Sequence, residues 1–195
     1  MASELLHLSD LELITAVLQG NQERYGDLVE RYQGRLVNYL FRLLRNLDEA
    51  HDLAQEVFLK VYQALDRYDS RYKFSTWLFR VARNAAIDQI RKRRVQLVST
   101  DRGGDSDGGS GTWEFPSPDP NPYGDLRNKE RGEALQTSID ALPWEYRELI
   151  LLRHFGELSY EQIAKLKEMP LGTVKNKLFR ARQMLKVELR GFLEN

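Results

Sequence analysis

The sequence predicts an all-α protein, with two small helical domains joined by a flexible acidic linker. Apolar residues recur every three to four positions in several long stretches, whereas no stretch shows the alternation that is typical of a strand. A segment rich in Gly, Pro and acidic residues separates two groups of such stretches. We therefore expect domains at residues 1–97 and 127–195, with the linker at residues 98–126.

The overall charge of the 195-residue chain is zero, but the charges are unevenly distributed. Residues 71–95 contain eight Lys or Arg and one acid, and residues 171–190 contain six and one. Two basic segments of this kind suit contacts with nucleic-acid phosphates. There is no cysteine and the three histidines lie far apart in sequence, so we expect no disulfide, metal or cofactor. Neither a signal peptide nor an apolar run of about 20 residues is present, which predicts a cytoplasmic protein without membrane insertion.

The first two helices are expected at residues 9–20 and at about 22–44. Ser9 and Glu12 have capping-box spacing, and Gly20 ends the first helix. In the second, Gly26 and Gly34 each cost up to about 1 kcal/mol relative to Ala. Packing of a broad apolar stripe outweighs that cost. The stripe contains Leu28, Tyr32, Leu36, Tyr39, Leu40 and Leu43.

A third helix is expected from Asp48 to about Leu65. Its core face carries Ala50, Leu53, Val57, Val61 and Ala64. A second face carries Asp48, Asp52, Gln55, Leu59 and Tyr62, because residues advance by about 100° along a helix. This mixed acidic and apolar face has two interpretations. It is either a solvated surface with stray hydrophobic residues or a docking surface for another protein.

A fourth helix is expected at residues 76–94, with Ser75 or Thr76 as its N-cap. The inner stripe contains Leu78, Phe79, Ala82, Ala86 and Ile90. Trp77, Arg80 and Asn84 lie on the other side, where an aromatic ring beside polar groups suits stacking on unpaired bases. Alternatively, Trp77 packs under a neighbouring loop. The basic run at residues 91–94 indicates phosphate contact.

The linker contains two aromatic residues, Trp113 and Phe115, which either dock on a surface or remain free. Beyond it, helices are expected at about Asn128–Ala141 and at residues 144–154, with Pro143 in the first turn of the latter.

Two further helices complete the second domain and form a helix-turn-helix pattern. Ser159 and Gln162 have capping-box spacing at the start of the first. In the second, Val174, Leu178, Ala181 and Leu185 form the core face. Asn176, Phe179 and Arg180 point outward, where Phe179 suits thymine methyl groups and Arg180 suits base edges. The flanking positions, several of which suit phosphates, are Thr173, Lys175, Lys177 and Arg182. The alternative is an amphipathic helix that closes a small bundle.

Three segments resemble the bacterial sigma factors of the sigma-70 family. Residues 48–58 (DEAHDLAQEVF) resemble the segment that docks on the polymerase clamp helices, and residues 73–84 (KFSTWLFRVARN) resemble the −10-reading segment. Residues 158–164 (LSYEQIA) with 170–175 (PLGTVK) resemble the −35-reading domain. The order matches the family, and the two-domain layout resembles its extracytoplasmic-function (ECF) group.

This resemblance implies a transcription initiation factor with three binding surfaces. The core-polymerase surface would contain Asp48, Asp52, Gln55, Glu56 and Leu59. The surface for −10 recognition and melting would contain Ser70, Arg71, Lys73, Phe74, Trp77, Arg80, Asn84, Asp88 and Arg91. The −35 surface would contain Thr173, Lys175, Asn176, Lys177, Phe179, Arg180 and Arg182.

The resemblance also implies partners: core RNA polymerase (clamp helices and flap), promoter DNA and an anti-sigma factor. No nucleophile–base pair or phosphate-cradling loop is apparent in the sequence, so we expect no enzymatic activity. Two other functions remain open. The first is a helix-turn-helix regulator that acts without polymerase, which leaves the acidic face of residues 48–65 unexplained. The second is a helical interaction protein, which leaves the outward Phe179–Arg180 pair unexplained.

Overall fold

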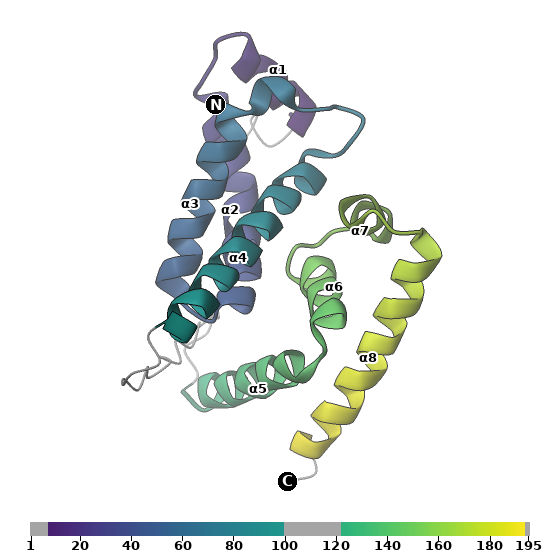
Figure 1. Cartoon of the computed structure of the whole chain (residues 1–195). Helices are drawn as coiled ribbons and strands as arrows, with labels where there is room; N and C mark the ends of the chain where they lie inside the picture. Colours follow the sequence, from purple (N-terminus) through teal and green to yellow (C-terminus); the bar gives the residue numbers. More distant parts are fainter. Residues whose placement is uncertain (1–7, 100–121, 194–195) are drawn as a thin grey trace.

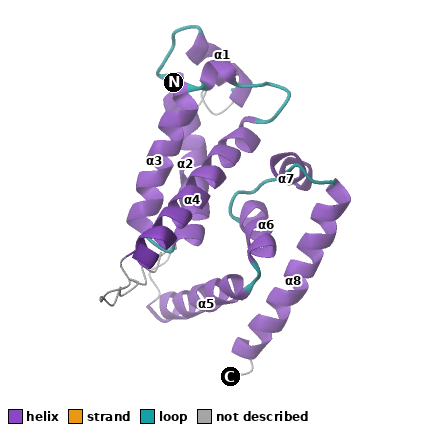
Figure 2. Ribbon diagram, viewed as in Figure 1, coloured by secondary structure: helices purple, strands orange, loops and turns teal. Residues whose placement is uncertain are grey.

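The computed structural model describes residues 8–99 and 122–193, and the side chains of residues 8–93 and 132–190. All regular structure in these ranges is helical, and they contain no strand (Figure 2). The α-helices are α1 (Asp10–Leu18), α2 (Arg24–Leu44), α3 (Leu47–Gln63), α4 (Phe74–Ser99), α5 (Pro122–Ala141), α6 (Trp144–His154), α7 (Tyr160–Lys167) and α8 (Leu171–Leu193). A short 3-10 helix, η2, covers Leu65–Arg67. The all-α prediction is confirmed.

The first four helices pack around α2, which contacts α1, α3 and α4 (Figure 1). The predicted capping box at Ser9 is present, since its hydroxyl accepts from the Glu12 amide and its own amide donates to the Glu12 carboxylate. Gly20 has φ +103°, a left-handed conformation that glycine adopts without strain, and the chain turns there into α2. The predicted apolar stripe of α2 is buried except for half-buried Leu43.

The fourth helix begins earlier than the sequence predicted. It starts at Phe74 because the Lys73 carbonyl accepts from the amides of Thr76 and Trp77, so Lys73 ends the preceding loop. Ser75 and Thr76 therefore lie in the first turn and are buried, rather than capping the helix. Near the linker, α4 extends to Ser99 and α5 begins at Pro122, so both helices enter the range predicted as linker. Trp113 and Phe115 lie outside the described residues.

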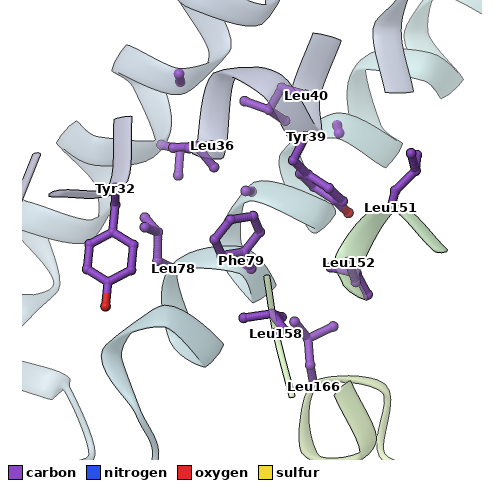
Figure 3. Packing of buried hydrophobic residues seen from close by; sticks show 14 of the residues in the cluster. Tyr32, Leu36, Tyr39, Leu40, Leu78, Phe79, Leu151, Leu152, Leu158 and Leu166 are labelled. Atoms are coloured by element: carbon purple, nitrogen blue, oxygen red, sulfur yellow. The ribbon is translucent and has the colours of Figure 1, made fainter. Parts of the chain in front are cut away.

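In the second group of helices, α8 packs on α5, α6 and α7. This group also contacts the first, through α7 against α4 and α6 against α2 (Figure 1). Figure 3 shows Tyr39 and Phe79 of the first group beside Leu151 and Leu152 of α6, and all four side chains are fully buried. One apolar cluster therefore runs through both groups. No described helix is both long and apolar enough to cross a bilayer.

Candidate nucleic-acid interface

Helices α7 and α8 form the predicted helix-turn-helix. The Ser159 hydroxyl accepts from the Gln162 amide at 3.2 Å, and the Gln162 side chain accepts from the Ser159 amide at 2.8 Å. This confirms the predicted capping box. Helix α7 ends at Lys167, the following Glu168 has a φ of 52° that reverses the chain, and α8 begins at Leu171. The short, locally satisfied turn fixes the angle between the two helices.

The inner and outer faces of α8 are sharply divided. Val174, Leu178 and Ala181 are fully buried, as the sequence predicted. Phe179, the next residue after Leu178, has 62% of its surface exposed. The ring therefore adds little to the core and is available for contact with a partner. Exposed residues of the same helix are Lys175, Asn176, Arg180 and Arg182, whereas Thr173 and Lys177 are half-buried.

Two of the flanking cations are held by neighbouring side chains. Lys177 Nζ lies 2.5 Å from a carboxylate oxygen of Glu145 on α6. Arg182 donates to the Tyr160 hydroxyl at 2.8 Å and lies 5.9 Å from the centre of the Tyr160 ring. These partners could not be predicted from local sequence patterns, because both come from other helices. They orient the cations but leave Arg182 exposed to a phosphate.

His154 of α6 lies near two arginines. Burial lowers the pKa of His154, and the nearby Arg182 and Arg153 guanidinium groups lower it further. A neutral His154 between two arginines adds no charge of its own at neutral pH.

The outer face of α3 is acidic and apolar at once. Asp48, Asp52 and Gln55 are exposed, and Leu59 has 55% of its surface exposed. Glu56 is also exposed and pairs with Lys60 at 2.6 Å. The predicted set therefore forms a continuous strip along one side of the helix.

A hollow that the sequence did not predict adjoins this strip. It has a volume of about 520 Å³ and is lined by Gln22, Glu23, Tyr25, Gly26, Phe58, Leu59 and Tyr62. The Tyr25 hydroxyl donates to the Phe58 carbonyl at 2.6 Å, and the Tyr25 and Tyr62 rings lie 4.9 Å apart. Tyr25 and Phe58 are 33 positions apart, so no local sequence pattern predicts their contact. The hollow beside Leu59 forms only once the chain has folded.

The loop before α4 presents polar side chains to solvent. Ser70, Arg71 and Lys73 are exposed. Arg71 donates several hydrogen bonds to Asp69, the shortest of 2.7 Å, and these bonds lower the pKa of the Asp69 carboxyl. The Arg71 guanidinium is therefore held against the loop by Asp69.

Along α4, the predicted −10 residues fall into exposed and covered groups. Asn84, Asp88 and Arg91 are exposed. Trp77 is half-buried against Tyr68, with ring centres 5.3 Å apart, so the alternative of packing against the preceding loop describes its position. Phe74 is only 1% exposed and packs edge-on against Tyr32, so it supports the surface from below and does not face solvent. Arg80 is half-buried and donates to the Lys165 carbonyl of α7 at 2.9 Å.

The side chains at these surfaces are suited to binding. No group of three or more His, Cys, Asp or Glu within the described part of the chain is arranged to hold a metal ion. The surfaces offer exposed cations and amides on α4 and α8, an exposed ring on α8, and carboxylates with leucine on α3. Cations and rings suit nucleic acid, whereas the acidic and apolar strip suits a protein partner.

Comparison with known proteins links both groups of helices to one family. A family model of Sigma-70 region 2 matches residues 28–95, and a model of Sigma-70, region 4, matches residues 132–185. The chain is 33% identical over 177 residues to the ECF RNA polymerase sigma factor SigW of Bacillus subtilis, which covers 91% of this chain and 95% of that protein.

Two solved structures share the fold. The structure of CnrH in complex with the cytosolic domain of CnrY aligns with a TM-score of 0.66 at 22% identity, covering 92% of this chain and 96% of that chain. The sigma factor RpoE in complex with the anti-sigma factor NepR from Bartonella quintana aligns with a TM-score of 0.64 at 24% identity, covering 84% and 97%.

Proposed function

This chain belongs to the ECF sigma factors of the sigma-70 family, and on that premise we propose how its surfaces divide the work of promoter-specific transcription initiation. The domain at residues 1–97 binds core RNA polymerase and reads and melts the −10 element. The domain at residues 127–195 reads the −35 element. The observation that carries this assignment is the exposed Phe179 on α8, directly beside the fully buried Leu178.

At the −35 element, α8 enters the major groove with its outward face. Asn176, Phe179 and Arg180 contact base edges and thymine methyl groups, because amide, ring and guanidinium groups match those partners. The cations that flank this set contact phosphates, which position the helix without reading sequence. The Arg182 side chain is held in place by its hydrogen bond to the Tyr160 hydroxyl of α7.

Core polymerase docks on the strip along α3. Asp48, Asp52 and Gln55 supply polar contacts to the clamp helices, and Leu59 supplies the apolar centre that protein interfaces need. The flap contacts the second domain. Docking through α3 leaves the loop and the exposed end of α4 free for the promoter.

At the −10 element, α4 and its preceding loop hold the separated strand. Asn84 and Arg91 are exposed and contact bases and phosphates, and the loop at residues 69–73 takes a flipped base. Trapping unpaired bases offsets a few kcal/mol of unstacking, so melting needs no chemistry from the protein. The family acts by binding, and we expect no catalytic activity.

Transcription from a genomic promoter library tests this function. Core polymerase is assayed with and without the chain, and with an Arg180→Ala variant. New specific start sites that depend on the chain support the proposal. DNA binding without polymerase-dependent starts supports the alternative regulator instead. The Arg180→Ala variant should lose about 1–3 kcal/mol at one −35 position, and uniform loss across sequences would make Arg180 a phosphate contact.

A protein partner follows from the same premise. The aligned RpoE structure is a complex with an anti-sigma factor, and we propose that this chain is likewise held by one in the cytoplasm, where its polymerase works. Copurification of the chain from its host, before and after stress, tests this. An anti-sigma protein should copurify with the chain before stress, and core polymerase should replace it after stress. Recovery of polymerase alone under both conditions would contradict the proposed partner.

A further inference from the structure

The loop before α4 is closed by hydrogen bonds between its own residues. The Tyr72 amide donates to the Asp69 carbonyl at 3.0 Å, which forms a tight turn, and the Asp69 carboxylate accepts from the Arg71 amide at 3.0 Å. The Tyr68 hydroxyl donates to the Tyr72 carbonyl at 2.5 Å. The backbone of the loop is therefore held in one shape before any partner binds.

The Asp69 carboxylate also fixes the direction of the Arg71 side chain. Arg71 Nε donates to both carboxylate oxygens, at 3.0 and 2.9 Å, and Nη2 donates to one of them at 2.7 Å. The third nitrogen, Nη1, has no acceptor within the described part of the chain, and the Arg71 side chain is 85% exposed. Because the guanidinium is planar, Nη1 and the second hydrogen of Nη2 form a fork of two donors that remains free.

The two residues form a pair of opposite charges. Hydrogen bonds from Arg71 lower the pKa of the Asp69 carboxyl, and hydrogen bonds to Asp69 raise the pKa of the Arg71 guanidinium. Two opposite charges in contact have little net charge, so the pair attracts a phosphate less strongly than a lone arginine does. Its free donors still match a neutral acceptor. The pair is therefore better suited to the edge of a base than to the DNA backbone.

Two neighbouring donors select a base by the acceptors on its edge. Guanine presents N7 and O6 side by side, and an arginine that spans them is the commonest specific contact with a base. Adenine places an amine beside N7, and thymine places a methyl group beside O4, so each offers the fork one acceptor. Cytosine has O2 and N3, but its N4 amine points in the same direction as N3 and meets the donors of the guanidinium. Guanine is therefore the base that fits the fork.

An aromatic ring lies beside the fork. Tyr72 follows Arg71 directly and has 38% of its surface exposed. Its phenol adds to the effect of Asp69 in raising the pKa of Arg71, so the ring and the guanidinium are close. An exposed ring suits stacking on an unpaired base, and a purine offers it a larger face than a pyrimidine does. The loop thus combines a stacking surface with a pair of donors.

We propose that the Asp69–Arg71 pair reads one guanine of the −10 element, through contact of the Arg71 fork with O6 and N7. This rests on the proposed function, because it takes the loop as part of the −10 surface. Arg71 makes the contact, and Asp69 is the positioning residue that holds the fork outward. The pair gives a sequence preference to a loop that otherwise only holds the separated strand.

Atomic substitution in the DNA tests the contact. The probes are forked promoter DNAs, taken from the promoter library, in which the −10 element is unpaired and each position carries each base in turn. Binding of the full chain with core polymerase is measured by competition against a fluorescent probe. At one position, guanine should bind about tenfold or more tightly than any other base. There, 7-deazaguanine, which lacks N7, should lose most of this advantage, whereas inosine, which keeps O6 and N7, should retain it.

Substitutions in the loop test the roles of the two residues. Arg71→Lys keeps the charge but removes the fork, so the preference for guanine should fall to about twofold or less. Asp69→Asn keeps an oxygen that can accept from the Arg71 amide but removes the carboxylate that orients the guanidinium. It should lower the preference about fivefold, as expected for loss of a hydrogen bond between charged groups.

Arg67→Lys is the matched control. Arg67 is also exposed, but it lies on η2, outside the loop. This variant should leave the preference for guanine unchanged. All three variants should bind the −35 duplex like the unmodified chain in fluorescence anisotropy, which shows that they fold.

Several results would overturn the guanine contact. Absence of a guanine preference at every position does so, as does a preference for another base that Arg71→Lys abolishes. Equal loss of binding to every probe in Arg71→Lys, with tighter binding to every probe in Asp69→Asn, would make Arg71 a phosphate contact instead. If the unmodified chain starts no transcription with core polymerase, the proposed function itself fails. Specific starts without the guanine preference refute the guanine contact alone.

Discussion

Substitution of two adjacent residues on α8 should separate folding from promoter recognition. Leu178 is fully buried, so Leu178→Ala removes three carbon atoms from the core and leaves a cavity. Lost transfer free energy is about 0.8 kcal/mol per carbon, and with the cavity the total loss is about 2–5 kcal/mol. Phe179→Ala removes a ring that is mostly in solvent, so the free energy of unfolding should change by no more than about 0.5 kcal/mol.

For −35 duplex binding, Phe179→Ala should have a direct effect that it lacks on stability. Phe179→Ala removes the contact proposed for a thymine methyl, which should weaken −35 binding by about 1–3 kcal/mol, or roughly 5- to 150-fold. Stability is measured by hydrogen exchange of peptides from α7 and α8, because local exchange reports this domain directly. Binding is measured by fluorescence anisotropy with a −35 duplex recovered from the promoter library.

Val187→Ala provides the control for this pair. Val187 is 70% exposed on the same helix but lies outside the proposed −35 set, so neither exchange nor binding should change. A Phe179→Ala variant that binds the duplex as tightly as the Val187→Ala variant would refute the assignment of this face. Faster exchange throughout α7 and α8 in the Phe179→Ala variant would show that the ring serves stability.

Three other changes test separate parts of the structure. Asp52→Lys reverses an exposed charge on α3 and should weaken binding to core polymerase without changing −35 duplex affinity, as competition binding will show. Ser159→Ala removes the capping box and should destabilise α7 by about 1 kcal/mol, measured by hydrogen exchange. Burial raises the pKa of the Tyr39 phenol above its ordinary value of 10.0, and its hydroxyl has no hydrogen-bond partner among the described residues. The contribution of the neutral Tyr39 phenol to the free energy of unfolding is therefore present below pH 10 and is lost as the pH rises toward the higher pKa of the folded chain. At pH 7, Tyr39→Phe should leave the midpoint of urea unfolding unchanged. Above pH 10, the variant should lose less stability than the wild type.

Local signals in the sequence were sufficient for the helices and their ends in several places. Both capping boxes, at Ser9 and Ser159, depend on residues three positions apart, and both were predicted correctly. The two faces of α8 also followed from spacing alone, since Leu178 and Phe179 differ by one helical step of about 100°. Such features are encoded within one turn of helix.

Long-range partners explain where the sequence prediction was incomplete. Ser75 and Thr76 have the chemistry of N-caps, but their hydroxyls contact Gln162, 87 and 86 positions away. Trp77 was predicted to be either a stacking platform or a packed ring, and its contact with Tyr68 could not be predicted from local spacing. Nothing in the local sequence indicates that Arg83 and Glu148 meet. The joint between the domains was therefore beyond prediction from pattern.

The apolar junction between the domains has a consequence for the life of the free chain. Separation would expose Tyr39, Phe79 and the leucines of α6 to water together. A contiguous apolar patch of this kind promotes aggregation and attracts proteases when no partner covers it. The packed form keeps these side chains out of water, so it protects the free chain from both.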